Sequence, residues 1–160
     1  MNKYEFSLRF DVAPCALSMD EIDDRLFEKG CDDALVRHSR RQEILLDFNR
    51  ESSSAVEAFR VAYEQIKTAL PQARLLEAKP DYVGPTDIAC VFDLSRQRIQ
   101  KILQTRASGL RALTSVGNTQ VFRLSHVIDE FSKLGTLHVK EPVRETAIAA
   151  MQMNRMNDLD

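Results

Sequence analysis

Hydrophobic and polar positions alternate over residues 4–12, where apolar side chains stand at every second position. A period of two puts these side chains on one face of a β-strand, so the pattern predicts a strand with a single buried face. Over residues 18–29 the spacing becomes helical and begins with a capping box of Ser18 and Glu21. The hydrophobic residues expected to face inward on this helix are Ile22, Leu26 and Phe27.

The pattern next predicts two strands, a long helix and a fourth strand. Residues 33–38 and 42–49 are expected to form strands joined by a basic turn, and residues 74–79 to form the fourth strand between two prolines. The helix between the strands at residues 42–49 and 74–79 should begin at a second capping box and end before Pro71. Its apolar stripe is expected to contain Val56, Phe59, Tyr63, Ile66 and Leu70.

The order strand, helix, strand, strand, helix, strand indicates an α+β fold for residues 1–80. Two helices that each bury one side can cover one face of a four-stranded antiparallel sheet, which is the ferredoxin-like βαββαβ arrangement. That fold hosts many unrelated functions. Dimerisation, binding of a protein partner and sensing of a small molecule therefore all stay open for this domain.

Residues 84–103, GPTDIACVFDLSRQRIQKIL, predict two short helices joined by a tight turn. The first should begin at Pro85 and the second should run over residues 96–104, with the turn at residues 93–95. Ile88 and Phe92 then face Ile99 and Ile102 across the pair. This is the pattern of a helix-turn-helix, whose second helix enters the DNA major groove.

The segment GPTDIA, followed six residues later by SRQRIQ, resembles the winged helix-turn-helix of the MerR and excisionase type. That family often has Gly at the turn, where this chain has Asp93, a residue that tolerates a left-handed backbone better than most. The resemblance implies double-stranded DNA as the ligand and a wing in the hairpin around Gly117. The residues expected to contact DNA are Thr86, Ser95, Arg96, Gln97, Arg98, Gln100, Lys101, Arg106, Arg111, Asn118 and Arg123.

A further helix is expected after the wing, capped by Ser125 and ended by Gly135, which completes a second domain over residues 81–135. The remaining residues, 136–160, are expected to form a partly helical tail starting at Pro142. Its Met and Ala face suggests a packing or oligomer surface, and its last four residues are expected to fray.

Charge supports this division. Residues 84–126 contain six Lys and Arg and two acids, whereas the whole chain has a net charge of -2. The positive charge is therefore concentrated on the helix-turn-helix, where phosphate binding requires a local field. The alternative is that these Lys and Arg form an ordinary solvated helix face.

Other chemistry is weakly indicated. Acids crowd the first helix at Asp20, Glu21, Asp23, Asp24 and Glu28, and they could hold a metal but more simply favour the helix dipole. The three cysteines and three histidines have no ligand spacing, and no nucleophile motif or phosphate loop is present. Cys90 is expected to be buried, and Cys15 or Cys31 could be an exposed redox sensor. No cofactor, metal or enzymatic activity is therefore expected.

The sequence predicts sequence-specific DNA binding by a small prokaryotic, phage or mobile-element transcriptional regulator. We expect a cytoplasmic homodimer without a membrane segment, reading half-sites about 34 Å, or a multiple of that distance, apart. The alternative is an antitoxin-like protein that binds a protein partner through its N-terminal domain or tail and also binds its own promoter.

Overall fold

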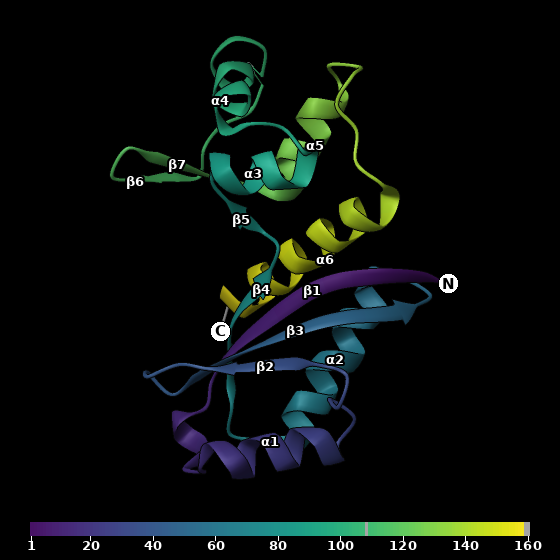
Figure 1. Ribbon diagram of the computed structural model, residues 1–160, viewed down its shortest axis with the longest axis vertical. Helices are drawn as coiled ribbons and strands as arrows, with labels where there is room; N and C mark the ends of the chain where they lie inside the picture. The colour runs from purple at the N-terminus through teal and green to yellow at the C-terminus, as the bar shows by residue number, and fades with distance from the viewer. Residues whose placement is uncertain (108, 159–160) are drawn as a thin grey trace.

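The computed structural model describes residues 1–107 and 109–158 (Figure 1). The first part of the chain forms β1 (Asn2–Asp11), the 3-10 helix η1 (Ala13–Cys15), α1 (Met19–Glu28), β2 (Leu35–His38), β3 (Glu43–Ser52), α2 (Ala55–Ala69) and β4 (Arg74–Lys79). The second part forms β5 (Tyr82–Val83), α3 (Pro85–Phe92), α4 (Arg96–Thr105), β6 (Thr114–Val116), β7 (Thr119–Arg123), α5 (Leu124–Ser132) and α6 (Glu141–Asp158). The fold is mixed α and β with antiparallel sheets.

The larger sheet has the strand order β2-β3-β1-β4, and each neighbouring pair is antiparallel. β1 lies in the middle and buries Tyr4, Phe6, Leu8 and Phe10, so the predicted alternation is confirmed. These side chains join Ile22 and Leu26 of α1 and the buried face of α2 in one hydrophobic cluster. The opposite face of the sheet is left uncovered by α1 and α2 (Figure 1).

The two helices on this sheet bury narrower faces than the sequence suggests. The buried residues of α2 are mostly small: Ala55, Ala58, Phe59, Ala62, Ile66 and Ala69. Val56 is 56% exposed and Phe27 of α1 is 67% exposed, so the prediction that both face inward is wrong. Each is adjacent in sequence to a buried position, about 100° around the helix from it, and points past the sheet instead of into it.

α6 lies along the free edge of β4 (Figure 1). The Asn154 amide accepts from the Ala78 backbone N–H (2.7 Å) and donates to the Ala78 carbonyl (2.8 Å), while Asn157 donates to the Leu75 carbonyl (2.8 Å). These side chains replace the strand that the edge of β4 lacks. Within the predicted tail, residues 136–140 are not helical and Glu141–Asp158 form one long helix, as the expectation of a partly helical tail has it. The fraying expected for residues 157–160 is contradicted at 157 and 158, and Leu159 and Asp160 lie outside the described residues.

A second hydrophobic cluster joins α3, α4 and α5 to the three-stranded sheet β5-β7-β6. Phe92 of α3 packs against Phe131 of α5 with ring centroids 5.0 Å apart. α6 contributes Ala147 to this cluster and Ala149 and Ala150 to the first one, so it contacts both. Of the helices in the described ranges, none is both long and apolar enough to cross a membrane.

The start of α5 differs from the prediction. α5 begins at Leu124, directly after β7, and its N-cap residue Arg123 makes no capping hydrogen bond through its side chain. Ser125 is buried within the first turn, where its hydroxyl donates to Met151 Sδ (3.3 Å). The expected cap at Ser125 is therefore wrong, because the strand runs into the helix without a connecting loop.

Candidate nucleic-acid interface

Local hydrogen bonds fix the angle between α3 and α4. Asp93 follows α3 with φ 55°, and the Leu94 N–H donates to the Ala89 carbonyl (3.0 Å), which closes the helix in a Schellman-type turn. The Ser95 hydroxyl then accepts from the Arg98 N–H (3.1 Å) and starts α4. The left-handed conformation expected at Asp93 is confirmed, and only one residue separates it from the next N-cap.

α4 has one buried side and one exposed polar side. Ile99 and Ile102 are buried in the second hydrophobic cluster. The residues expected to read DNA all lie exposed on the other side or at its N-cap: Ser95, Arg96, Gln97, Arg98, Gln100 and Lys101. The structure therefore brings together most of the predicted site on one helix.

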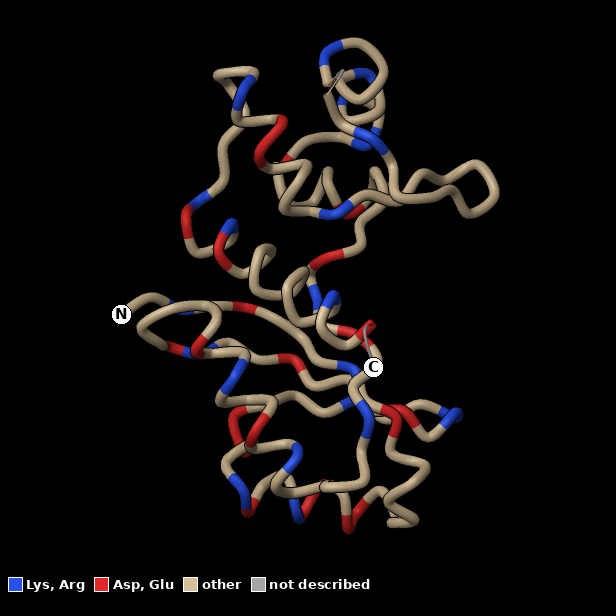
Figure 2. Tube along the Cα trace, turned by 180° about the vertical axis from the view of Figure 1, so that it is seen from behind, with Lys and Arg blue, Asp and Glu red and all other residues tan. Residues whose placement is uncertain are grey.

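Among the described residues, no carboxylate pairs with the cations of α4. α4 contains no Asp or Glu, and among the described residues no salt bridge involves Arg96, Arg98 or Lys101. Figure 2 shows Lys and Arg gathered at this end of the molecule, whereas positive and negative residues are mixed over the large sheet and its helices. The N-terminus of α4 adds the partial positive charge of its unpaired N–H groups.

The remaining predicted contacts surround α4 at different positions. Thr86, in the first turn of α3, is exposed, and so are Arg106 and Arg111 in the segment that follows α4. In the described ranges, neither arginine forms a salt bridge. Both extend the cationic surface beyond the end of the helix.

The hairpin β6–β7 projects from the molecule beside α3 and α4 (Figure 1). Its two-residue turn is Gly117 and Asn118, and Gly117 has φ 61°, as the first position of a type II′ turn requires. Asn118 is exposed at the tip and Val116 is 69% exposed. From Thr114 to Gln120 the hairpin has no charged residue, so its contact surface is uncharged.

Arg123 does not belong to this surface, which corrects the prediction that it contacts DNA. Its side chain is 9% exposed and its Nη1 lies 2.7 Å from Oδ2 of the fully buried Asp81. The same Asp81 oxygen accepts from Asn154 (2.9 Å), and the guanidinium lies 5.2 Å from the centroid of the Tyr82 ring. Arg123 of β7 is thus linked to β5 through Tyr82 and to α6 through Asp81 and Asn154. Its guanidinium is held inside the fold and cannot reach a phosphate.

Sequence reasoning missed this buried group of Arg123, Asp81 and Asn154. The partners are 42 and 73 residues apart, and an Arg in an alternating strand usually marks a solvated position. Asp81 between Pro80 and Tyr82 offered no local sign of burial. The group became recognisable only once β5 and β7 were paired, with Tyr82 opposite Arg123.

The cysteines do not follow the predictions. Cys90 is exposed on α3, although it was expected to be buried, because the inward positions of that helix are Ile88 and Ala89. Cys31 is buried in the first cluster, and burial raises the pKa of its thiol; burial also raises the pKa of the half-buried Cys15. An exposed, activated redox thiol at Cys15 or Cys31 is therefore not supported.

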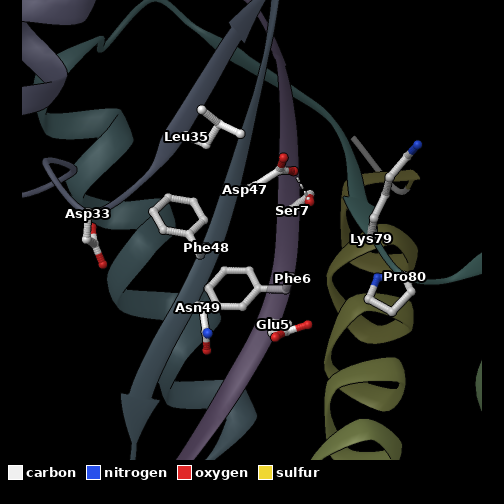
Figure 3. A pocket seen from close by; sticks show the side chains of 10 residues that line it. All are labelled: Glu5, Phe6, Ser7, Asp33, Leu35, Asp47, Phe48, Asn49, Lys79 and Pro80. Carbon is white, nitrogen blue, oxygen red and sulfur yellow. Dashed lines mark hydrogen bonds between the residues drawn. The ribbon is translucent and has the colours of Figure 1, made fainter. Parts of the chain in front are cut away.

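A shallow cavity of about 450 Å³ lies on the uncovered face of the large sheet (Figure 3). Its polar groups are largely engaged: Ser7 donates to Asp47, which also pairs with Arg37, and Asp33 pairs with Arg50. Among the described residues, no group of three or more His, Cys, Asp and Glu could hold a metal ion. The sheet face thus offers a small ligand few free charged groups.

Comparisons with known proteins give no relative: no protein-family model, no curated protein sequence and no solved structure matches this chain.

Proposed function

We propose that this protein binds double-stranded DNA sequence-specifically as a small transcriptional regulator, through a winged helix-turn-helix of the MerR and excisionase type attached to a ferredoxin-like domain. The strand order β2-β3-β1-β4 with α1 and α2 on one face supports the ferredoxin-like assignment. The turn at Asp93, the angle it imposes on α4 and the hairpin that follows support the winged helix-turn-helix.

One observation carries the proposal: the exposed side of α4 consists of Arg, Lys and Gln residues that are free of carboxylate partners in the described part of the chain. On the large sheet and its helices, Arg9, Arg37, Arg50 and Arg60 pair with carboxylates and acidic residues lie among the cations, whereas α4 contains no acid. A phosphate-binding surface requires unpaired cations, because an internal carboxylate would compete with the phosphate.

Roles follow from the position of each residue on α4. Arg96 and Gln97 lie in the first turn, from which a recognition helix contacts base edges, and Arg to guanine and Gln to adenine are the pairings that geometry favours. Lys101, Arg98, Arg106 and Arg111 supply phosphate contacts. Asn118 and its uncharged neighbours on the hairpin contact the sugar–phosphate backbone beside the groove without adding charge. The mechanism is steric and positional and involves no covalent chemistry.

The test begins with selection of bound sequences from a random duplex pool, followed by gel-shift titration of variants on the selected and on a scrambled duplex. Arg96→Ala and Gln97→Ala should each reduce the preference for the selected duplex, because a bidentate base contact contributes about 1–3 kcal/mol of discrimination. Lys101→Ala should weaken binding to both duplexes by the same factor. Equal losses on both duplexes for Arg96→Ala and Gln97→Ala would rule out the base-reading role.

Salt gives an independent check. If about four phosphates are neutralised by each copy, affinity for any duplex should fall on the order of a hundredfold between 50 and 200 mM salt. A chain that selects no sequence and shows no dependence on salt does not bind DNA, and the proposal fails.

A further inference from the structure

The two edges of the four-stranded sheet differ. The β4 edge is closed by the side chains of Asn154 and Asn157 on α6. The β2 edge is open: within the described residues, the backbone hydrogen bonds of β2 go to β3, and none is made on its other side. An open edge is a template for another strand.

Two large hydrophobic side chains flank this open edge. Leu35, in β2, is 57% exposed beside the cavity on the uncovered face (Figure 3). Phe27, in α1, is 67% exposed, and its side of the helix borders β2, since Asp23 one turn earlier lies 2.7 Å from His38 Nε2. Apolar area is therefore exposed on both faces of the edge strand.

The charges at the two ends of β2 are opposite. Asp32 and Asp33 precede the strand, with Asp33 paired to Arg50, and Arg40 and Arg41 follow it. Arg40 and Arg41 are exposed and form no salt bridge with any described residue. If two copies of this edge meet antiparallel, the acidic end of each meets the basic end of the other, and the contact forms twice.

We propose that a second copy of this chain docks along β2, so that two β2 strands pair antiparallel about a two-fold axis. A register centred on Arg37 would oppose two guanidinium groups, which is unfavourable. The register centred on Val36 instead opposes Leu35 to Arg37 and puts Arg40 level with Asp32 of the second copy. Phe27 is placed by the contact between Asp23 and His38. The step along α1 from Asp23 to Phe27 and the step along β2 from His38 to Val36 are both about 6 Å. Phe27 therefore lies level with Val36, and the two Phe27 rings meet near the axis.

This dimer has a consequence for DNA, which rests on the proposed function. β2 lies on the side of the large sheet that is farther from α4, with β3, β1 and α6 between them, and α1 lies at the end of the molecule beyond β2 (Figure 1). A two-fold axis perpendicular to the sheet at β2 therefore directs the two α4 helices outward at the far ends of the dimer. Such a dimer joins two separate duplex segments, in contrast to two half-sites on one duplex, about 34 Å or a multiple of that distance apart, expected from the sequence.

Sedimentation velocity of the full chain tests the interface. The wild type should sediment as a dimer at micromolar concentration. Arg40→Glu alone and Asp32→Lys alone should each weaken the dimer about tenfold, because each puts like charges at both ends of the interface. An equimolar mixture of the two variants should restore dimers, since each end then pairs opposite charges. Arg74→Glu, an exposed arginine of β4, is the control for charge and should have no effect.

A second pair of variants tests the hydrophobic contact. Phe27→Ser should weaken the dimer on the order of tenfold to a hundredfold. Met156→Ser, at a 71% exposed position on α6 beside the opposite edge, should leave it unchanged. A monomeric wild type, failure of the charge-reversed mixture to associate, or a dimer broken by Met156→Ser and not by Phe27→Ser would each overturn the proposal.

The DNA consequence is measured separately, by capture of a fluorescent duplex on a second, immobilised duplex of the selected sequence. The wild type should join the two, and Arg40→Glu should bind single duplexes normally without joining them. A dimer that binds no duplex contradicts the proposed function and leaves the interface standing. A monomer that binds DNA contradicts only the interface.

Discussion

The large sheet and its helices carry positive residues mixed with acidic ones, whereas α4 carries positive residues and no acidic one. Arg9, Arg37, Arg50 and Arg60 on the sheet and its helices each form a salt bridge with a nearby carboxylate. On α4, in the described part of the chain, Arg96, Arg98 and Lys101 have none. Both regions are rich in arginine, so composition alone does not separate them.

The difference shows that a slightly acidic protein can still present a cationic surface. A paired arginine contributes little field at a distance, because the adjacent carboxylate has the opposite charge and cancels most of it. Unpaired cations on one short helix add their fields together. The net charge of -2 therefore says little about what this chain can bind, and the distribution of partners says more.

Arg123 is an exception to this comparison. It lies in the same part of the chain as α4, but it pairs with a carboxylate, as Arg9, Arg37, Arg50 and Arg60 do on the large sheet and its helices. Arg123→Met should lower the free energy of unfolding by about 3–5 kcal/mol, since it leaves the fully buried Asp81 carboxylate without its cation. Chemical denaturation measures this change. Arg111→Met, at an exposed arginine near the same hairpin, should change stability by less than about 0.5 kcal/mol. A fully stable Arg123→Met variant with weakened DNA binding would return Arg123 to the DNA-contacting surface.

Arg98 and Arg37 test paired against unpaired cations directly. Arg98→Ala should reduce the slope of log affinity against log salt by about 1 on a scrambled duplex, because one phosphate contact is lost. Arg37→Ala, at an exposed arginine that pairs with Asp47, should leave the slope unchanged. Fluorescence anisotropy at several salt concentrations gives both values. Equal changes in the two variants would mean that pairing does not decide which cations bind phosphate.

The smallest expected effect is a pH dependence on the sheet side of the molecule. Hydrogen bonds from Ser18 in the capping box lower the pKa of Glu21. Because folding lowers this pKa, the carboxylate stabilises the native state above its unfolded pKa of about 4.3, and the contribution is lost as pH falls through the folded value. Glu21→Gln should therefore lower Tm at neutral pH, with a difference from wild type that shrinks on acidification. A difference that stays constant down to about pH 2 would exclude the carboxylate as its cause.

Elements bounded by strong local signals could be predicted from the sequence. The strand Arg74–Lys79 has the predicted bounds, because Pro71 and Pro80 stand on either side of it. The helices α3 and α4 begin where Pro85 and Ser95 indicate, and the exposed side of α4 follows from its helical period. These features depend on residues within one or two turns of each other.

Features that depend on packing could not be predicted in this way. Weighting large hydrophobic residues placed Val56 and Phe27 inside, whereas alanines form most of the close contact between α2 and the sheet. An alanine lets a helix pack closely against the sheet. Alanines at helical spacing are nevertheless a weaker signal of a buried face in a sequence than large hydrophobic residues are. The role of Arg123 depended on Asp81 and Asn154, which are distant along the chain.

The position of α6 bears on how such a protein could evolve by exchange of parts. The chain leaves the first sheet at β4, forms the elements from β5 to α5 and returns as α6 to complete the core beneath β1 and β4. A genetic exchange that replaced residues 81–135 would have to preserve the fit of Ala147 and Asn154 on both sides of the junction. The two units are consecutive in sequence but share α6, so a replacement of either one would have to fit both cores.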